Sequence, residues 1–363
     1  MLSANCEWFR SCAISTILTM HQRHQLYFEK VHPSIPMIHR PRYLAAMNLA
    51  PNMRPPICLR YIMWCLASTC SEKYGSLTEI FYHRAKKYAY LDEMKGHGES
   101  MITLAHCQAW LLISMHEFKC MHFPRAWLTV GRAARAAQMM MLHRLDGTGL
   151  DVKQCLAPPR DWTEREERRR TFWMAFCQDR YASIGTGWPM TIDERDIKTN
   201  LPASDEAFEK SRPESTISLE RALKPGGVIR ISPMSSVIVM AALFGHNLHH
   251  LHRPTPEDMD DNLDGAFWKR HRKLEEILTN IALTLPDYLR LPGGLPDPNV
   301  IFMNMAIHTS VICLHQAAIF KAERNRLPPN VSSESRVRCV SAATETARIM
   351  KMITHLDLAT VCS

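Results

Sequence analysis

The chain has 363 residues, of which 46% are hydrophobic and only 14 are glycine, against an average glycine content of about 7%. This length exceeds the roughly 100 to 200 residues of an ordinary domain, so we expect two domains or one large helical domain. The formal net charge of +8 permits an acidic partner such as nucleic acid, but does not require one, because helices of mixed charge give the same balance.

Apolar residues recur at spacings of three and four along most of the chain, which predicts core-facing helices. In chain order these helices are 57–71, 77–90, 101–118, 125–143, 163–183, 233–252, 262–285, 300–325 and 332–355. Proline pairs mark the loops between them, and no run of alternating strands is found. The sequence therefore predicts an all-α fold, a large helical bundle in two parts.

One long segment, residues 201–232, lacks this periodicity and is rich in Pro, Ser, Glu and Lys. We interpret it as an exposed, mobile linker. It would divide the chain into an N-terminal helix at 1–23, an N-terminal half at 24–200 and a C-terminal half at 233–363. No run of eighteen apolar residues and no secretory cleavage pattern is present, so we predict no membrane partner.

The twelve cysteines are scattered, and none of them forms a Cys-x-x-Cys pair. A six-cysteine binuclear zinc cluster needs two such pairs, because closely spaced ligands wrap one metal from a short loop. These 363 residues therefore contain no zinc-cluster DNA reader. The thiols are typical of a reduced intracellular protein.

Two groups of histidine and cysteine fall on single helical turns. His246, His249 and His250 lie at i, i+3 and i+4, and His116 lies one turn before Cys120. Neither group contains the His-Glu-x-x-His arrangement that supplies both metal ligands and a general base. We predict structural or surface histidines, no metal site and no cofactor.

Two charged runs invite a nucleic-acid interpretation. In the run 164–170, glutamates lie one turn from arginines, so the run is nearly self-neutralising. The run 269–273, Lys-Arg-His-Arg-Lys, is less compensated and could be a nuclear localisation signal, a phosphate patch or a solvated helix face.

Enzyme motifs are absent: there is no Gly-x-Ser-x-Gly elbow and no glycine-rich phosphate loop. Acid and base side chains on the predicted helices could still meet in an interhelical pocket. The candidate catalytic residues are His106, His116, Glu117, Asp179 and Arg180.

The middle of the chain resembles the regulatory domain, or middle homology region, of fungal zinc-cluster transcription factors. Residues 27–41 resemble its "YF..VHP.FPILHRP" opening, and residues 126–144 resemble its "W...G.A.R.A..LGLHR" helix. The most specific match is to "E.RRR.FW..F..DR", followed by a Gly-Arg-Pro turn and "I.D.DI...LP". The matching positions are Arg168, Arg169, Arg170, Trp173, Asp179, Arg180, Pro189, Asp193 and Asp196.

This sequence departs from the family pattern at two positions. Met141 replaces the usual glycine before His143, so we expect the helix to continue through this turn. Trp188 replaces the arginine of the Gly-Arg-Pro turn, which removes a cation and adds an aromatic surface suited to ligand contact. As an effector pocket we predict Trp110, Met139, His143 and Trp188.

The resemblance implies a regulatory protein of the nucleus that acts through protein partners, as a homodimer, or by sensing a small-molecule ligand. Without a zinc cluster in this chain, we expect it to make no direct contact with DNA. The alternative is a relative recruited as a cytoplasmic biosynthetic enzyme, such as a cofactor-independent cyclase, isomerase or pericyclase. A third hypothesis is a scaffold that dimerises with an intact factor.

Overall fold

The computed structural model describes residues 21–147, 155–253 and 258–356, and within them it contains helices and loops but no strand. Residues 21–30 are helical; the rest of the N-terminal helix predicted at 1–23 lies outside the described residues. The further α-helices are α2 (Arg40–Ala46), α3 (Ile57–Thr69), α4 (Thr78–Glu93), α5 (Leu104–Lys119), α6 (Phe123–Met139), α7 (Trp162–Ile184), α8 (Asp205–Glu209), α9 (Leu219–Ala222), α10 (Pro233–His252), α11 (Ala266–Thr284), α12 (Pro298–Arg324) and α13 (Pro329–Met352). The predicted all-α class is confirmed.

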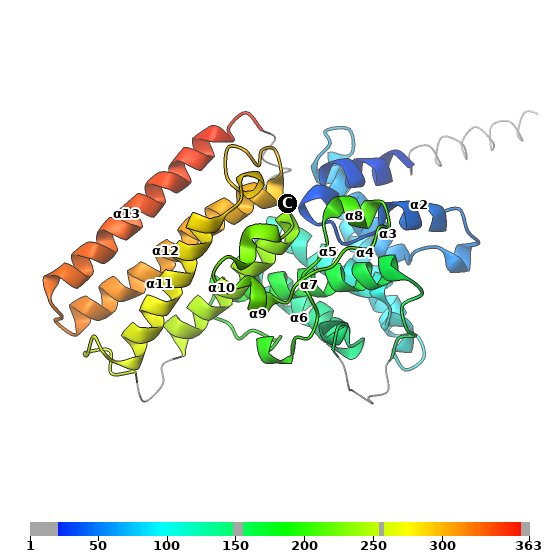
Figure 1. Cartoon of the computed structure of the whole chain (residues 1–363). Coiled ribbons are helices and arrows are strands. Elements are labelled where there is room, and N and C mark those ends of the chain that lie inside the picture. Colours follow the sequence, from blue (N-terminus) through cyan, green and yellow to red (C-terminus); the bar gives the residue numbers. More distant parts are fainter. Residues whose placement is uncertain (1–20, 148–154, 254–257, 357–363) are drawn as a thin grey trace, which may run out of the picture.

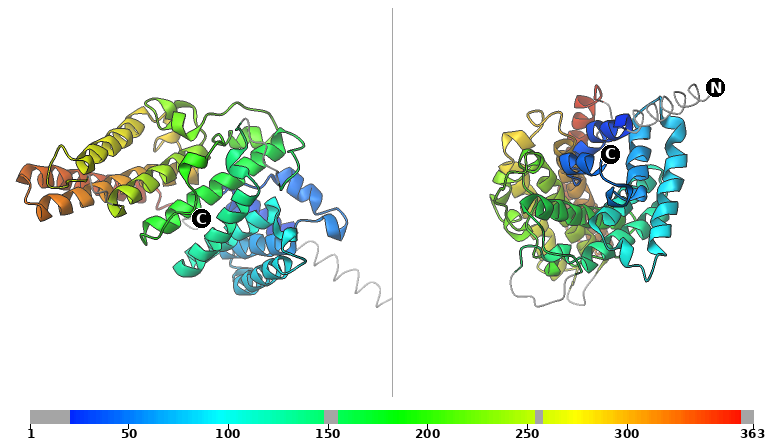
Figure 2. Two further views of the ribbon diagram at one scale, coloured as in Figure 1. Left: turned by 90° about the horizontal axis from the view of Figure 1, so that it is seen from below. Right: turned by 90° about the vertical axis from the view of Figure 1, so that its right-hand side faces the viewer.

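The helices form two groups that meet at α10 (Figure 1). Helices α2 to α7 form one group, and α11, α12 and α13 form an elongated group that extends from it in a second view (Figure 2). Helix α10 contacts α7 on one side and α11 and α12 on the other. One apolar core runs through the junction, from Tyr27 in the first group to Leu314 in α12.

Local sequence fixes where the long helices begin. The Asp161 carboxylate accepts a hydrogen bond from the Glu164 backbone N–H at 2.9 Å, which caps α7. Pro233 opens α10 and Pro329 opens α13, at the helical position where a missing N–H costs nothing. Helix α12 has the length and hydropathy of a membrane span, and 44% of its most apolar window is buried inside the fold.

Residues 201–232, predicted to be a mobile linker, pack against the helical body. They contain α8, α9 and a 3₁₀ turn at Gly227–Arg230, and Leu201, Phe208, Leu219 and Val228 are buried. These apolar side chains are spaced too irregularly to show a period, although each is inserted into the core. The domain boundaries themselves stay a prediction.

The expectation that the helix continues through Met141 is wrong. Helix α6 ends at Met139, and Met141 adopts the left-handed conformation with φ 58° and ψ 28°. Residues with a Cβ are strained in this conformation, which explains why glycine suits this position.

We expect Met141→Gly to raise the free energy of unfolding by about 0.5 to 1 kcal/mol, because glycine adopts this conformation without strain. The matched control is Met139→Gly, the same substitution two residues earlier, at the exposed last residue of α6, where the backbone is still helical. That control should be destabilised, by up to about 1 kcal/mol, the cost of glycine within a helix. Urea denaturation of both variants measures the difference, and equal destabilisation by the two would contradict the strain argument.

Candidate functional site

The arginines of α7 point into the protein. Arg170 is fully buried and pairs with Glu166 at 3.1 Å, with the Asp205 carboxylate at 2.6 Å and with the backbone carbonyls of Pro36 and Ala203 at 2.8 Å. Such a network satisfies the guanidinium donors in every direction. The run 164–170, predicted to be nearly self-neutralising, thus contributes Glu166 and Arg170 to a buried ion network that holds α7 to its neighbours.

Arg168 and Arg169 have partners of the same kind. Arg168 pairs with Glu164 at 2.6 Å, and Arg169 pairs with Asp146 at 2.9 Å and with Glu166. Both arginines are less than one tenth exposed. None of the three arginines is therefore available to contact a phosphate backbone.

The second half of α7 anchors the loop that follows it. The Asp179 carboxylate accepts hydrogen bonds from the backbone N–H groups of Thr191 and Ile192 at 2.9 to 3.0 Å. Arg180 donates to Asp179 at 2.7 Å and to the Ile192 carbonyl at 2.8 Å. Farther along the loop, the Trp173 indole N–H donates to the Asn200 carbonyl at 2.6 Å. Residues 190–200 are thereby fixed at both ends.

This loop forms one wall of a groove whose other wall is α10. The first part of the groove is a cavity of about 1230 Å³, and a second cavity of about 660 Å³ lies between α10, α9 and α11. The two cavities share four lining residues: Glu220, His246, His249 and Arg253. We call these two adjoining cavities together the α10 groove.

Basic side chains outnumber acidic ones around the α10 groove. The basic residues are Arg144, Arg180, Arg195, Lys198, Lys224, Arg253, Arg270 and Lys273, and the acidic residues are Asp146, Asp193, Glu194 and Glu220. Each acid has a cationic or histidine neighbour; for example, Glu194 lies 3.0 Å from His246 Nε2. Lys198, Arg253 and Lys273 form no ion pair with any described residue, and these three free cations favour an anionic ligand.

His249 lies between the two cavities. Its pKa is lowered, first by burial and then by the neighbouring positive charges of Arg253, Arg180 and His246. Burial contributes most to this shift, and the neighbouring cations lower the pKa in the same direction. Leu223, Leu274 and Ile277 add apolar surface to the second cavity.

The predicted effector residues do not line this groove. Trp110 is buried in the core beside Tyr90. Met139 is exposed at the end of α6. Trp188 packs on Trp127, and the centroids of the two rings are 5.1 Å apart. His143 is half-buried, with its Nδ1 lacking a partner among the described residues. The structure does not bring the four together.

The groove contains other residues that the sequence singled out. Arg180 and Asp193 line its first cavity, although Asp193 is itself paired with Arg195 at 2.6 Å. Pro189 precedes the lining loop, and Asp196 pairs with Arg144 at 3.2 Å.

The α10 histidines that were considered as a metal site point to different partners. His246 contacts Glu194, whereas His250 stacks on Phe267.

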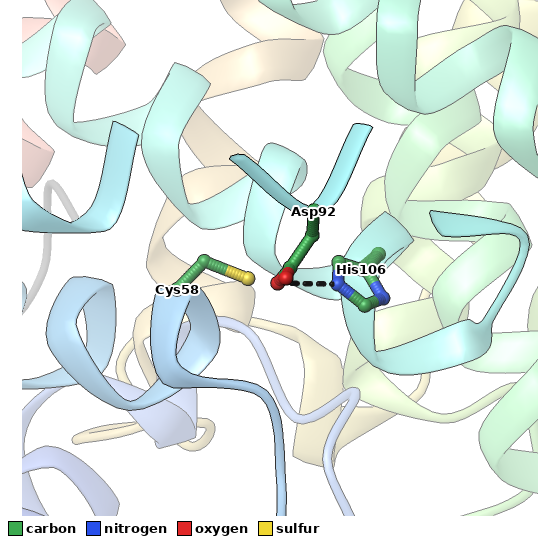
Figure 3. A group of neighbouring side chains, drawn as sticks. All are labelled: Cys58, Asp92 and His106. Atoms are coloured by element: carbon green, nitrogen blue, oxygen red, sulfur yellow. Dashed lines mark hydrogen bonds and ion pairs between the residues drawn. The ribbon is translucent and has the colours of Figure 1, made fainter. Parts of the chain in front are cut away.

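The catalytic candidates are dispersed and are already paired. His106 lies 3.1 Å from Asp92 and 2.8 Å from Thr103 Oγ1. Figure 3 shows Asp92 standing between Cys58 and His106, which places a negative charge next to the thiol. Burial, then the charge of Asp92, raises the pKa of Cys58 to about 12. In a catalytic triad the histidine base contacts the nucleophile and the carboxylate lies behind the histidine. Here the carboxylate of Asp92 lies between the Cys58 thiol and the His106 ring.

The neighbouring candidates have internal partners too. His116 lies between two thiols, Cys65 at 3.5 Å from Nδ1 and Cys120 at 3.6 Å from Nε2. Glu117 is fully buried and accepts hydrogen bonds from three side chains at 2.6 to 2.8 Å: Tyr82, Lys86 and Thr129. Of the five catalytic candidates, only Arg180 reaches the α10 groove.

The basic run 269–273 lies on α11 and does not form one continuous patch. Arg270 pairs with Asp258 at 2.5 Å, Arg272 donates to the Leu263 carbonyl at 2.9 Å, and His271 is buried. Lys269 and Lys273 are exposed.

Comparison with known proteins identifies the class to which this fold belongs. The model of the fungal specific transcription factor domain matches residues 24–259, and the chain belongs to this family. It is 31% identical over 293 residues to the pigment biosynthesis transcriptional activator pigB of Monascus ruber, covering 80% of this chain and 53% of that protein. No solved structure matches.

Two further relatives are named for citrinin biosynthesis. The transcriptional activator mrl3 of Monascus ruber is 30% identical over 96% of this chain and 67% of its own length. The activator ctnR of Monascus purpureus is 30% identical over 94% of this chain and 58% of its own length. The chain thus spans about half to two thirds of the length of these curated relatives.

Proposed function

We propose that this chain regulates transcription of a secondary-metabolite gene cluster in the nucleus, and that the α10 groove binds an anionic small molecule that controls it. The relatives named for pigment and citrinin biosynthesis support the regulatory part. The cations Lys198, Arg253 and Lys273, which form no ion pair within the described part of the chain, support the anionic ligand. The apolar surface of Leu274 and Ile277 suits a ligand with a carbon skeleton beside its charge.

In this proposal the chain itself makes no direct contact with DNA. The family-signature arginines that could suggest it are buried and paired, as Arg170 illustrates. The chain would act through a homodimer or another protein. Ligand binding would link α10 to the 190–200 loop, the wall of the groove that α7 anchors through Asp179.

The first test uses sodium salicylate, an aromatic carboxylate, as a probe with purified protein. At ten times the Kd, binding stabilises the folded state by about 1.4 kcal/mol, enough to raise the Tm by about 2 °C in a protein of this size. We expect Arg253→Ala to weaken binding about 10- to 100-fold, because a hydrogen bond to a charged group contributes about 1.5 to 3 kcal/mol.

The matched control is Lys87→Ala, which removes an exposed cation on α4, outside the lining of both cavities. It should bind salicylate as the wild type does. Equal affinity in the Arg253→Ala and Lys87→Ala variants would refute the groove as the binding site. A reporter gene driven by the chain fused to a heterologous DNA-binding domain then tests regulation: activity should respond to cluster metabolites in Lys87→Ala but not in Arg253→Ala.

A further inference from the structure

Three potential metal ligands converge where α11 meets α12. His271 and Glu275 lie one turn apart on α11, and His315 comes from the middle of α12. One donor atom from each lies within 4.8 Å of the other two. His315 Nε2 is 3.6 Å from Glu275 Oε1, and the two imidazole rings have centroids 5.1 Å apart. Figure 1 shows α11, α12 and α13 lying side by side in this region.

The imidazole of His271 is buried without the partners that a buried ring normally has. The residue is 5% exposed, and its Nδ1 forms no hydrogen bond with any described residue. Buried polar atoms in folded proteins are almost always paired, so an orphaned nitrogen beside two other donors calls for an explanation. A bound cation would supply one.

The protonation state of the two rings suits a metal. The pKa of His271 is lowered to about 3, first by burial and then by the positive charges of His315, His250 and Arg272. The pKa of His315 is lowered by burial and further by Arg338, while Glu275 opposes the shift. Burial thus favours the neutral form of both rings, and the neutral ring is the form that binds metal.

Helix α13 supplies two side chains that contact the potential ligands His315 and Glu275. His315 Nδ1 lies 3.3 Å from the Ser335 hydroxyl, which leaves Nε2 directed toward Glu275. Metal-binding histidines are commonly held this way, through a hydrogen bond from the second nitrogen. Arg338 lies 3.3 Å from Glu275 Oε1 and is exposed, so it pairs with the carboxylate from the solvent side.

We propose that His271, Glu275 and His315 bind a divalent cation of the zinc type, which ties α11 to α12. Two imidazoles and one carboxylate are a known zinc ligand set, with water or another ligand as the fourth donor. The Cys58, Asp92 and His106 set is less suitable, because Lys95 pairs with one oxygen of Asp92 and burial raises the pKa of the Cys58 thiol, whereas the thiolate is the form that binds metal. This site is independent of the α10 groove proposal.

The test is calorimetric titration of the chelator-treated 363-residue chain with zinc chloride alone. We expect one equivalent to bind to the wild type. Glu275→Gln, which keeps the shape of the side chain and removes its charge, should weaken binding by at least about tenfold, since even second-shell changes cost 10- to 100-fold. The matched control is Glu276→Gln, the same change at the next, exposed residue of α11, which should bind as the wild type does.

Cobalt(II) substitution identifies the ligands. Tetrahedral nitrogen and oxygen coordination gives visible d–d absorption without the near-ultraviolet charge-transfer band of a thiolate ligand. His315→Gln, checked for folding by circular dichroism, should also abolish the d–d signal. Arg338→Gln should tighten zinc binding several-fold by removing the competing cation. No zinc uptake by the wild type, unchanged affinity in Glu275→Gln, or a thiolate band would each overturn the assignment.

Discussion

Replacing Arg170 with alanine is expected to lower the free energy of unfolding by about 3 to 5 kcal/mol, the usual cost of breaking a buried ion pair. The side chain is fully buried and pairs with Glu166, which is fully buried as well. Its guanidinium also lies over the Phe208 ring, 4.3 Å from the centroid. The substitution therefore leaves a carboxylate without one of its partners and two buried carbonyls without their donor.

Urea denaturation measures this loss, with Arg160→Ala as the matched control. Arg160 pairs with Glu164 at 2.8 Å near the start of α7, but its side chain is 82% exposed. Exposed pairs contribute about 0 to 1 kcal/mol, so this control should change little. A loss below about 1 kcal/mol in Arg170→Ala would show that the network is dispensable. Arg170→Lys should recover only part of the loss, because lysine cannot reach several acceptors at once.

The long helices could be predicted from the sequence because their core-facing residues repeat locally. For α10 the predicted range and the observed range, Pro233–His252, are the same. Residues 201–232 show the limit of this reasoning. Phe208 and Leu219 are buried by contacts with distant parts of the chain, and such contacts leave no local period.

The candidate site was only partly predictable for the same reason. Arg180 could be selected from its place in a motif, and it does line the α10 groove. Lys198 and Arg253 could not be selected, since each is an ordinary surface cation until the fold sets α10 against the 190–200 loop. The proposed metal site is predictable in one part and not in the other. The spacing of His271 and Glu275 is visible in the sequence, but His315 reaches them only through the packing of α12 on α11.

His250→Phe is expected to make the protein more resistant to acid. His250 is 5% exposed, stacks on Phe267 with centroids 4.4 Å apart, and has neither ring nitrogen paired with a described residue. Its pKa is lowered to about 4, first by burial and then by Arg270 and Lys321, against the opposing charge of Asp258. His271 is the nearest other titrating ring, with its centroid 6.0 Å away.

The sign of the effect follows from proton linkage. The unfolded chain takes up a proton at this histidine near pH 6.5, whereas the folded protein does so only near pH 4. Folding stability is therefore lost as the pH falls from about 6.5 towards 4, by about 1.4 kcal/mol per pH unit for this group. At pH 5 phenylalanine, which takes up no proton, should be the more stable by about 2 kcal/mol.

Urea denaturation at pH 7.5 and pH 5, with a chelator present, separates this effect from simple repacking. At pH 7.5 the variant and the wild type should differ little, because an apolar ring of similar size replaces an unpaired neutral one. At pH 5 the curves should separate in favour of the variant. A difference that stays constant between the two pH values would mean that His250 takes no part in the acid sensitivity of the fold, whatever its effect on packing.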